Sequence, residues 1–388
     1  MRVLVISNDV TPGFGVPVAA PGLRSAGIAE GLRAHGIDVS LTVPTGVIEP
    51  LFPAGAPHPP AHTAVVDPTL LMDHIRDGSF DTVVFSNANM TPHLDAIGGV
   101  RFIFDMFAPK LLESLASGSP GRPWNEMAVE KERGFALADE IWVNGRRKLG
   151  YALGWMLRPT VDDVRQTQFG KPSLIDQDVL DQVNVVEMPV PLPDGVSNEP
   201  NRMNATTSLS VGVAGYAQQW SALPAIHPVH QLVVDSGHHL HGLVPHHWGA
   251  RPEDEPSNQL PVETITHEGP LEFSEFARWV QSMDAMIDVF APSAERYFAM
   301  ITRTAVALRL GVPVLHGVDS EIADIIRECN AGWVIDPDDL DAWRRALEEM
   351  TDGAVVAEKR AGARLASQAR FAPKAALAGV ARTLNERS

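Results

Sequence analysis

The chain has 388 residues, of which 45% are hydrophobic and 20% are charged, as in an ordinary globular protein that buries a core. At about 150 residues per domain, this length favours two domains. Its 31 Lys and Arg stand against 48 Asp and Glu, a net charge of −17. This argues against a general binder of nucleic acid or anionic membranes, because such polyanions are held by positive surfaces. The single cysteine, Cys329, cannot form an internal disulfide, so nothing indicates an oxidising compartment.

The N-terminal residues MRVLVISNDV are typical of a short buried strand rather than a signal peptide. No apolar run of 18 residues occurs, so we expect no transmembrane segment. These features predict a cytoplasmic protein, and we expect a monomer or a homodimer.

The first 45 residues predict a β–loop–α–β unit, the building block of an open parallel sheet. A strand at 3–6 is followed by a Gly/Pro-rich loop at 11–22, a helix that ends at Gly36, and a strand at 39–43. The segment 44–60 is too rich in Pro and Gly for regular structure and is predicted to be a surface loop. Further strands are predicted at 82–85, 101–104 and 140–143.

The segment 188–207, dense in Pro, Asn and Ser, is the predicted linker to a second domain. Strand-like and helical segments then alternate again, at 208–213, 222–233, 239–243, 264–267, 273–281, 285–290, 312–316 and 332–335, before a final amphipathic helix. The predicted fold class is α/β, with two Rossmann-like domains that face a cleft. Their bounds are 1–195 on the acceptor side and 205–365 on the donor side, with a C-terminal helix at 366–388 that could cross back to the N-terminal domain. Ligands of such sheets bind beyond the carboxyl ends of the strands, so the cleft is the expected site.

Two such domains fit a dehydrogenase, a periplasmic binding protein or a GT-B glycosyltransferase. A dinucleotide fingerprint is incomplete, because Gly13-x-Gly15 is followed by Val18 where the third glycine would stand. The segments APSAERYFAMITRTAVALRLGVPVL (291–315) and AGWVIDPDD (331–339) are more specific. They resemble the donor-binding domain of GT-B glycosyltransferases, particularly the retaining family 4 (glycosyltransferases group 1). VRFIFDMFAPKLLESLA (100–116) and ADEIWVNGRRKLGYALGWML (138–157) resemble the N-terminal half of one branch of that family.

The resemblance implies transfer of a sugar from a nucleotide diphosphate sugar to a small-molecule or glycan acceptor, with retention and without an essential metal or cofactor. It assigns Glu295 to a sugar hydroxyl. Asp105, at a predicted strand end, is expected to point into the cleft and face the acceptor, and these two carboxylates are the catalytic candidates. Asp105 could instead cap the helix expected near Pro109. The family's second glutamate falls on Val306, which is apolar, so ribose recognition must come from elsewhere, with Glu321 as a candidate.

A diphosphate needs cations and helix N-terminal amides, whose N–H groups attract anions. Arg303, between Thr302 and Thr304 in the first turn of a predicted helix at 301–310, is the leading phosphate candidate, since a guanidinium pairs bidentately with phosphate oxygens. A solvated helix residue is the alternative. Other donor-site candidates come from two glycine-containing loops and from the predicted loop 293–300: Gly13, Gly15, Gly215, Arg296, Tyr297 and Phe298. Arg24 is a lesser phosphate candidate.

Asn144, Arg146, Arg147 and Lys148 form the dense basic cluster of an acidic chain, which suggests contact with a phosphate or an acidic acceptor, or a solvated helix start. Seven histidines lie between residues 227 and 247. We do not expect a metal there, because no cysteine accompanies them and alternate residues of a strand face opposite ways. His246 and His247 are candidates for the nucleotide site. The Asp-x-Asp at 336–338 precedes a helix and suits an N-cap better than a metal.

The sequence therefore predicts a retaining glycosyltransferase with a nucleotide-sugar donor and no nucleic-acid partner. Arg outnumbers Lys, and Ala and Val are abundant, which suggests a GC-rich bacterium and an acceptor from antibiotic or other specialised metabolism. One alternative is a related transferase that forms an N-, S- or pseudo-glycosidic bond. Others are a non-catalytic nucleotide-sugar-binding protein and an NAD-dependent dehydrogenase.

Overall fold

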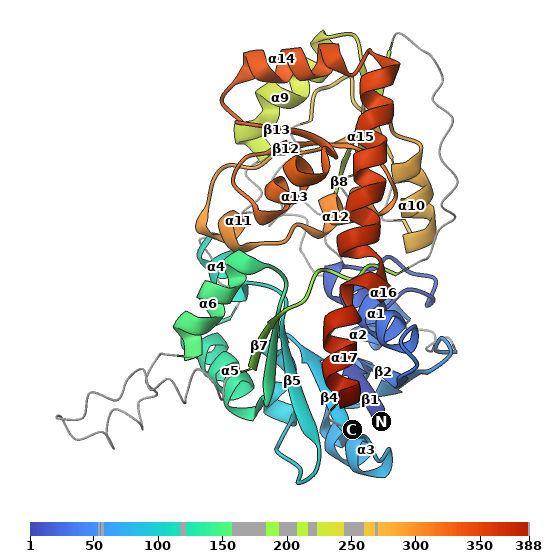
Figure 1. Ribbon diagram of the computed structural model, residues 1–388, viewed down its shortest axis with the longest axis vertical. Helices are drawn as coiled ribbons and strands as arrows, with labels where there is room; N and C mark the ends of the chain where they lie inside the picture. The colour runs from blue at the N-terminus through green and yellow to red at the C-terminus, as the bar shows by residue number, and fades with distance from the viewer. Residues whose placement is uncertain are drawn as a thin grey trace, which may run out of the picture.

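A computed structural model describes residues 1–52, 55, 58–116, 122–156, 184–193, 208–215, 223–243, 260–267 and 271–386. These residues form two lobes, each built around a parallel sheet with helices on its faces (Figure 1). The predicted fold class, two Rossmann-like α/β domains, is confirmed by these two sheets. Among the described residues, none of the helices has the length and apolarity needed to span a bilayer.

The N-terminal sheet has seven parallel strands in the order β3-β2-β1-β4-β5-β6-β7. Its central strands are buried on both faces, which explains their continuous apolar runs. The strands are β1 (Arg2–Ile6), β2 (Asp38–Pro44), β3 (Thr63–Val66), β4 (Thr82–Ser86), β5 (Arg101–Met106), β6 (Glu140–Val143) and β7 (Asn184–Glu187). The helices are α1 (Ala20–Arg33), α2 (Thr45–Ile48), α3 (Leu71–Asp77), α4 (Lys110–Ala116), α5 (Trp124–Leu137) and α6 (Arg146–Met156), with short turns η1 (Glu49–Leu51), η2 (Pro68–Leu70) and η3 (Ala88–His93).

The C-terminal sheet has six parallel strands in the order β10-β9-β8-β11-β12-β13. They are β8 (Ser210–Ala214), β9 (His239–Leu243), β10 (Ile265–Thr266), β11 (Ala285–Asp288), β12 (Val314–Gly317) and β13 (Gly332–Ile335). The helices are α9 (Leu223–Asp235), α10 (Phe273–Gln281), α11 (Ala294–Phe298), α12 (Thr302–Arg309), α13 (Glu321–Cys329), α14 (Leu340–Glu349) and α15 (Gly353–Ala366). In each sheet the strand order reverses at the first strand, and ligands of such sheets bind at this switch point.

The chain end returns to the N-terminal lobe. A π-type turn, η6 (Ser367–Phe371), leads from α15 into α16 (Pro373–Ala376) and α17 (Ala378–Glu386), so both termini lie at one lobe (Figure 1). Leu377, Val380 and Leu384 join the apolar cluster formed by α1 and the strands β1 and β2. Gly31 of α1 allows this approach, since a Cβ there would stand 2.5 Å from the carbonyl oxygen of Pro373.

The sequence missed two edge strands and two short helices. Strands β3 and β7 are four residues each at the two edges of the sheet, too short to give a clear pattern beside Pro-rich or polar segments. The predicted loop 44–60 contains α2, and the predicted loop 293–300 contains α11, which the Ser293 side chain caps by accepting a hydrogen bond from the Arg296 N–H at 3.1 Å. Most of the predicted linker, 194–207, lies outside the described residues.

Candidate functional site

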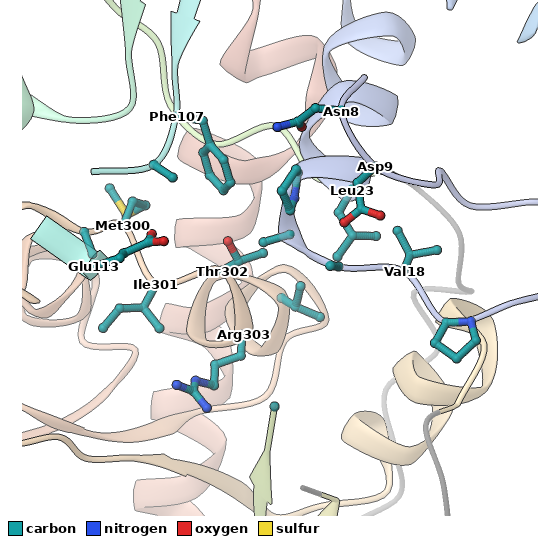
Figure 2. Close-up of a pocket in the computed structure, with 18 of the residues that line it drawn as sticks. Asn8, Asp9, Val18, Leu23, Phe107, Glu113, Met300, Ile301, Thr302 and Arg303 are labelled. Carbon is teal, nitrogen blue, oxygen red and sulfur yellow. The ribbon is translucent and has the colours of Figure 1, made fainter. Parts of the chain in front are cut away.

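A cavity of about 610 Å³ lies between the two lobes, at the carboxyl ends of strands from both sheets. From the N-terminal lobe it is lined by residues that follow β1, β4 and β5 and by the start of α1. From the C-terminal lobe it is lined by Gly215 and Leu243 after β8 and β9, by residues of α10, and by the segment 295–306. Figure 2 shows Asp9 from the loop after β1 on one side and Thr302 and Arg303 of α12 on the other.

Arg303 lies in the first turn of α12 and lines the cavity. Its Nε is 3.2 Å from Asp288 Oδ1, and its Nη1 donates to the carbonyl oxygen of Ala214 at 2.8 Å. Gly215 leaves room for the guanidinium, since a Cβ there would stand 2.6 Å from Arg303 Nη1. The side chain is 25% exposed, so it is fixed in direction but open to a ligand.

Asp288 is also contacted by Thr304 and His316. The Thr304 hydroxyl donates to Asp288 Oδ2, and His316 Nδ1 lies 3.7 Å from the same oxygen. Burial lowers the pKa of His316 to about 4, so this ring is neutral at pH 7. Arg303 is therefore the cation that balances Asp288. Thr304 itself is buried and supports this pair rather than lining the cavity.

Glu295 and Arg296 also line the cavity, and they bind one another. Arg296 Nε donates to Glu295 Oε2, and its Nη2 donates to Oε1 at 3.0 Å. Burial raises the pKa of Glu295, and the Arg296 charge opposes this. The Arg296 and Arg303 guanidinium groups each lie over the ring of Phe290, at 4.3 and 4.4 Å from its centroid. Two guanidinium groups are thus held close together on the C-terminal wall.

Two helix N-termini face the cavity from opposite lobes. The start of α1 contributes Ala19, Ala20 and Pro21 to the lining, and the start of α12 contributes Ile301 and Thr302. Neither helix has a side-chain hydrogen bond at its N-cap residue. First-turn N–H groups without a capping side chain carry partial positive charge and attract anions.

The N-terminal wall carries a different set of charges. Lys110 Nζ donates to Glu113 Oε2 at 2.9 Å, and this carboxylate raises the pKa of Lys110, which keeps it protonated. Asp9 lines the cavity beside them and is only 6% exposed. Burial raises the pKa of Asp9 to about 6, while the Val10 N–H and Lys110 lower it.

Asp105 does not face the cavity, contrary to the sequence-based expectation. It forms a bidentate pair with Arg24, at 2.7 Å from Nε to Oδ2 and 2.6 Å from Nη2 to Oδ1, and accepts from the Ser86 hydroxyl at 2.9 Å. Both charged side chains are fully buried. The strand end that suggested a cleft residue is covered by α1, so Arg24 and Asp105 act together behind the wall.

The basic cluster after β6 also lies away from the cavity lining. Lys148 is buried and donates to the Phe107 carbonyl oxygen and to Asn144 Oδ1. The Arg146 side chain is 80% exposed, 3.7 Å from Glu187. Arg147 donates to Asp324 of the other lobe at 2.8 Å. The expected acceptor contact of this cluster is therefore not seen among the lining residues.

Glu321, Tyr297 and Phe298 connect the two lobes instead of lining the cavity. Glu321 accepts from the backbone N–H of Arg146 and, at 3.2 Å, of Arg147, so it caps the start of α6 across the lobes. Tyr297 lies under the Arg147 guanidinium at 4.6 Å, and Phe298 packs on Tyr151 at 5.4 Å. The roles expected for Glu321, Tyr297 and Phe298 at the donor are thus replaced by interlobe contacts.

Other sequence candidates are placed as follows. Gly13 and Gly15 flank the buried Phe14 and do not line the cavity, which is reached by residues 17–21 instead. His246, His247 and residues 216–220 lie outside the described residues. Val306 lines the cavity with its apolar side chain. The N-cap expected for the helix after 336–338 is made by Asp339, which accepts from the Ala342 N–H at 2.8 Å. No group of three or more His, Cys, Asp or Glu that suits a metal occurs in the described part of the chain.

The sequence missed the polar residues of the N-terminal wall: Asn8, Asp9, Asn89 and Lys110. Their signal was available, because polar residues directly after a buried parallel strand lie at the ligand-binding edge of a sheet. Asn8 and Asp9 show this pattern, since they follow closely on β1.

No protein-family model matches the chain, and no curated protein matches its sequence. Solved structures do match over nearly the full length. A sucrose-phosphate synthase from Thermosynechococcus elongatus is similar with a TM-score of 0.66 at 13% identity, covering 100% of both chains. An alpha-glucosyltransferase in complex with UDP has a TM-score of 0.64 at 13% identity, covering 99% of this chain and 100% of the other. The catalytic domain of starch synthase IV from Arabidopsis thaliana, bound to ADP and acarbose, has a TM-score of 0.60 at 10% identity, covering 99% and 98%.

These are GT-B glycosyltransferases. The chain has the GT-B fold. The narrower resemblance to retaining family 4 stays a prediction from the segments 100–116 and 291–315.

Proposed function

We propose that the protein is a glycosyltransferase that moves a sugar from a nucleotide diphosphate sugar to a small-molecule or glycan acceptor. The observation that carries the proposal is the cavity between the lobes. Arg296 and Arg303 lie on one wall, Lys110 lies on the other, and two helix N-termini without side-chain caps open into the space. Such an arrangement suits a diphosphate, whose charge is distributed over several oxygens.

The same groups suit the departure of the nucleotide. When the bond between the sugar and the diphosphate breaks, negative charge builds up on the leaving oxygen, and preorganised cations stabilise it. Arg303 is held in place by Asp288 and the Ala214 carbonyl, so it needs little rearrangement. The bound UDP and ADP named for two similar structures support a nucleoside diphosphate as the product.

Retention is the stereochemical outcome we propose, with a transition state that resembles an oxocarbenium ion. The support is the resemblance of segments 100–116 and 291–315 to the retaining family 4. The same proposal includes independence of metals, a cytoplasmic location and an acceptor from bacterial specialised metabolism, which rest on sequence composition and that resemblance. A transferase that forms an N-, S- or pseudo-glycosidic bond uses the same donor site and is the nearest alternative.

A second candidate is a non-catalytic nucleotide-sugar-binding protein. Val306 favours it, because an apolar side chain lines the cavity at the position of the family's ribose-binding carboxylate, and Glu321 is engaged by α6. Loss of that carboxylate weakens donor binding but leaves the cationic wall intact.

The test is incubation with a panel of UDP-, ADP-, GDP- and dTDP-sugars, with release of the nucleoside diphosphate as the measurement. Slow release to water from one donor, accelerated by an acceptor, is the expected result. Thermal stabilisation by a nucleotide with no release, even with acceptors present, would support the binding protein instead. Failure to bind any nucleotide would overturn both.

A further inference from the structure

Three neighbouring strand ends place polar side chains side by side on the N-terminal wall. Strands β1, β4 and β5 are adjacent and parallel. Asn8 and Asp9 follow β1, Asn89 follows β4, and Lys110 and Glu113 follow β5, and all five line the cavity. This wall therefore offers hydrogen-bonding groups to whatever lies against the N-terminal lobe.

Asp9 differs from the other cavity-lining carboxylates. Glu113 is paired with Lys110, and Glu295 is paired with Arg296. Asp9 Oδ1 accepts from the Val10 N–H at 2.7 Å, whereas Oδ2 has no hydrogen-bond or ion-pair partner among the described residues. Figure 2 shows Asp9 on the side of the cavity that carries Val18 and Leu23, with Thr302 and Arg303 of α12 across from it. Asp9 Oδ2 is not among the buried side-chain atoms that lack a hydrogen-bond partner, so it is accessible from the cavity and free to accept a hydrogen bond from a ligand.

The two walls differ in charge. Among the lining residues, Asp9 and Glu113 outnumber Lys110 on the N-terminal wall, whereas the C-terminal wall presents two guanidinium groups, Arg296 paired with Glu295 and Arg303 paired with Asp288 behind the wall. A diphosphate is attracted to the C-terminal wall. The group that rests on the N-terminal wall must bring hydrogen-bond donors and no negative charge of its own.

We propose that Asp9 Oδ2 accepts a hydrogen bond from the hydroxyl group that attacks the sugar, and that the acceptor is an uncharged or amine-bearing polyhydroxylated molecule rather than a phosphorylated one. This rests on the proposed function. The bond between the anomeric carbon and the diphosphate oxygen breaks with its electrons going to the diphosphate. The acceptor oxygen bonds to that carbon, and its proton passes to the departing phosphate oxygen. Asp9 holds the hydroxyl in place and keeps its own protonation state.

Asp9→Asn is the decisive variant. The amide oxygen can still accept a hydrogen bond from the Val10 N–H. An NH₂ group then replaces Oδ2, and because it can only donate hydrogen bonds, it cannot accept one from the hydroxyl of the acceptor molecule. We expect the KM for the acceptor to rise at least tenfold or, when water is the acceptor, the rate of donor hydrolysis to fall at least tenfold. The affinity for UDP should not change. The control is Asp77→Asn, an exposed carboxylate at the end of α3 that does not line the cavity, which should match the original protein.

The pH profile separates this role from a merely structural one. Burial raises the pKa of Asp9 to about 6, so the acceptor KM of the original protein should rise as the pH falls below about 6. The other charged groups around it are Lys110 and Glu113 on α4, Glu295 and Arg296 on α11, and Arg303 on α12, and all of them are kept in Asp9→Asn. The variant should lose this inflection.

The acceptor class is tested with a pool of monosaccharides and cyclitols in uncharged, amine-bearing and phosphorylated forms, with products identified by mass spectrometry. Products from the uncharged or amine-bearing members support the inference, and products from the phosphorylated members overturn it. An Asp9→Asn variant with an unchanged acceptor KM and hydrolysis rate also overturns it. If the original protein binds nucleotides but turns over no donor, the proposed transferase itself fails.

Discussion

An arginine–aspartate pair joins a helix to a strand in each lobe, and these two pairs, Arg24 with Asp105 and Arg303 with Asp288, differ in exposure. Arg24 on α1 and Asp105 on β5 are both fully buried, with two hydrogen bonds between them. Arg303 on α12 and Asp288 at the end of β11 share one contact at 3.2 Å, and Arg303 is 25% exposed at the cavity. The same chemistry thus gives a fully buried pair in one lobe and a cation exposed to the cavity in the other. Exposure at the cleft, and not residue type, separates them.

The largest expected effect is on the buried pair. Arg24→Met should lower the free energy of unfolding by about 3–5 kcal/mol, because it leaves the Asp105 carboxylate buried without its cation. Urea unfolding measures this. The double variant Arg24→Met/Asp105→Asn should be less destabilised than Arg24→Met alone, since the uncompensated charge is gone. A single variant as stable as the original protein would contradict the structural role.

Arg303→Met should act on turnover more than on folding. Loss of a charged phosphate contact should reduce donor turnover at least tenfold, about 1.4 kcal/mol in activation free energy. Its unfolding free energy should change less than that of Arg24→Met, because the side chain is partly solvated. Arg303→Lys should restore part of the rate, since it keeps the charge without the planar fork. Arg344→Met, on the exposed face of α14, is the control, and near-normal turnover of Arg303→Met would reject the assignment.

Lys148 should make the stability of the N-terminal lobe depend on pH. Burial, followed by the nearby Arg24 charge, lowers the pKa of Lys148 from 10.5 to about 7. Between these values the unfolded chain binds more protons than the folded one, so the unfolding free energy should rise with pH, by up to about 1.4 kcal/mol per pH unit.

Lys131 adds to this slope in the same direction, because burial lowers its pKa to about 7 as well. Lys148→Met should therefore reduce the increase of the unfolding free energy between pH 7 and pH 9, and Lys131 should preserve part of that increase. This expectation concerns the pH dependence and not the absolute stability of the variant. The exposed Lys374→Met should leave the slope as it was. Chemical unfolding at several pH values measures the slope of the unfolding free energy against pH. An unchanged slope in Lys148→Met would show that the Lys148 amine is charged in the folded protein.

Glu321→Gln should have the smallest effect. It removes the charge that caps α6 across the lobes, which is worth about 1 kcal/mol. Hydrogen exchange of the Arg146 and Arg147 amides should therefore speed up roughly fivefold. Gly145→Ala should act at the same place, because its Cβ would stand 2.2 Å from Glu321 Oε2. The exposed Glu348→Gln is the control, and unchanged exchange in Glu321→Gln would mean that the interlobe cap contributes nothing.

The fold was largely predictable, and the site only in part. Buried parallel strands such as β1, β4 and β5 have continuous apolar runs that the sequence displays directly. Arg303 was found because a cation in a helix first turn opposes the helix dipole unless an anion is near. Asp105 and Lys148 were misplaced, because a strand end or a helix start can be covered by another element. Asp9 was not among the predicted site residues, although it follows closely on β1.

The sequence by itself determined two α/β domains, their strand ends and the acidic balance of the chain, since these depend on local periodicity and composition. The tertiary structure decided which charged side chains line the cavity. Arg24 and Arg303 are the same residue type, but Arg24 on α1 is fully buried with Asp105, whereas Arg303 is 25% exposed at the cavity. That distinction depends on contacts between residues far apart in the chain, such as Arg24 with Asp105 and Glu321 with the start of α6, which no local pattern encodes.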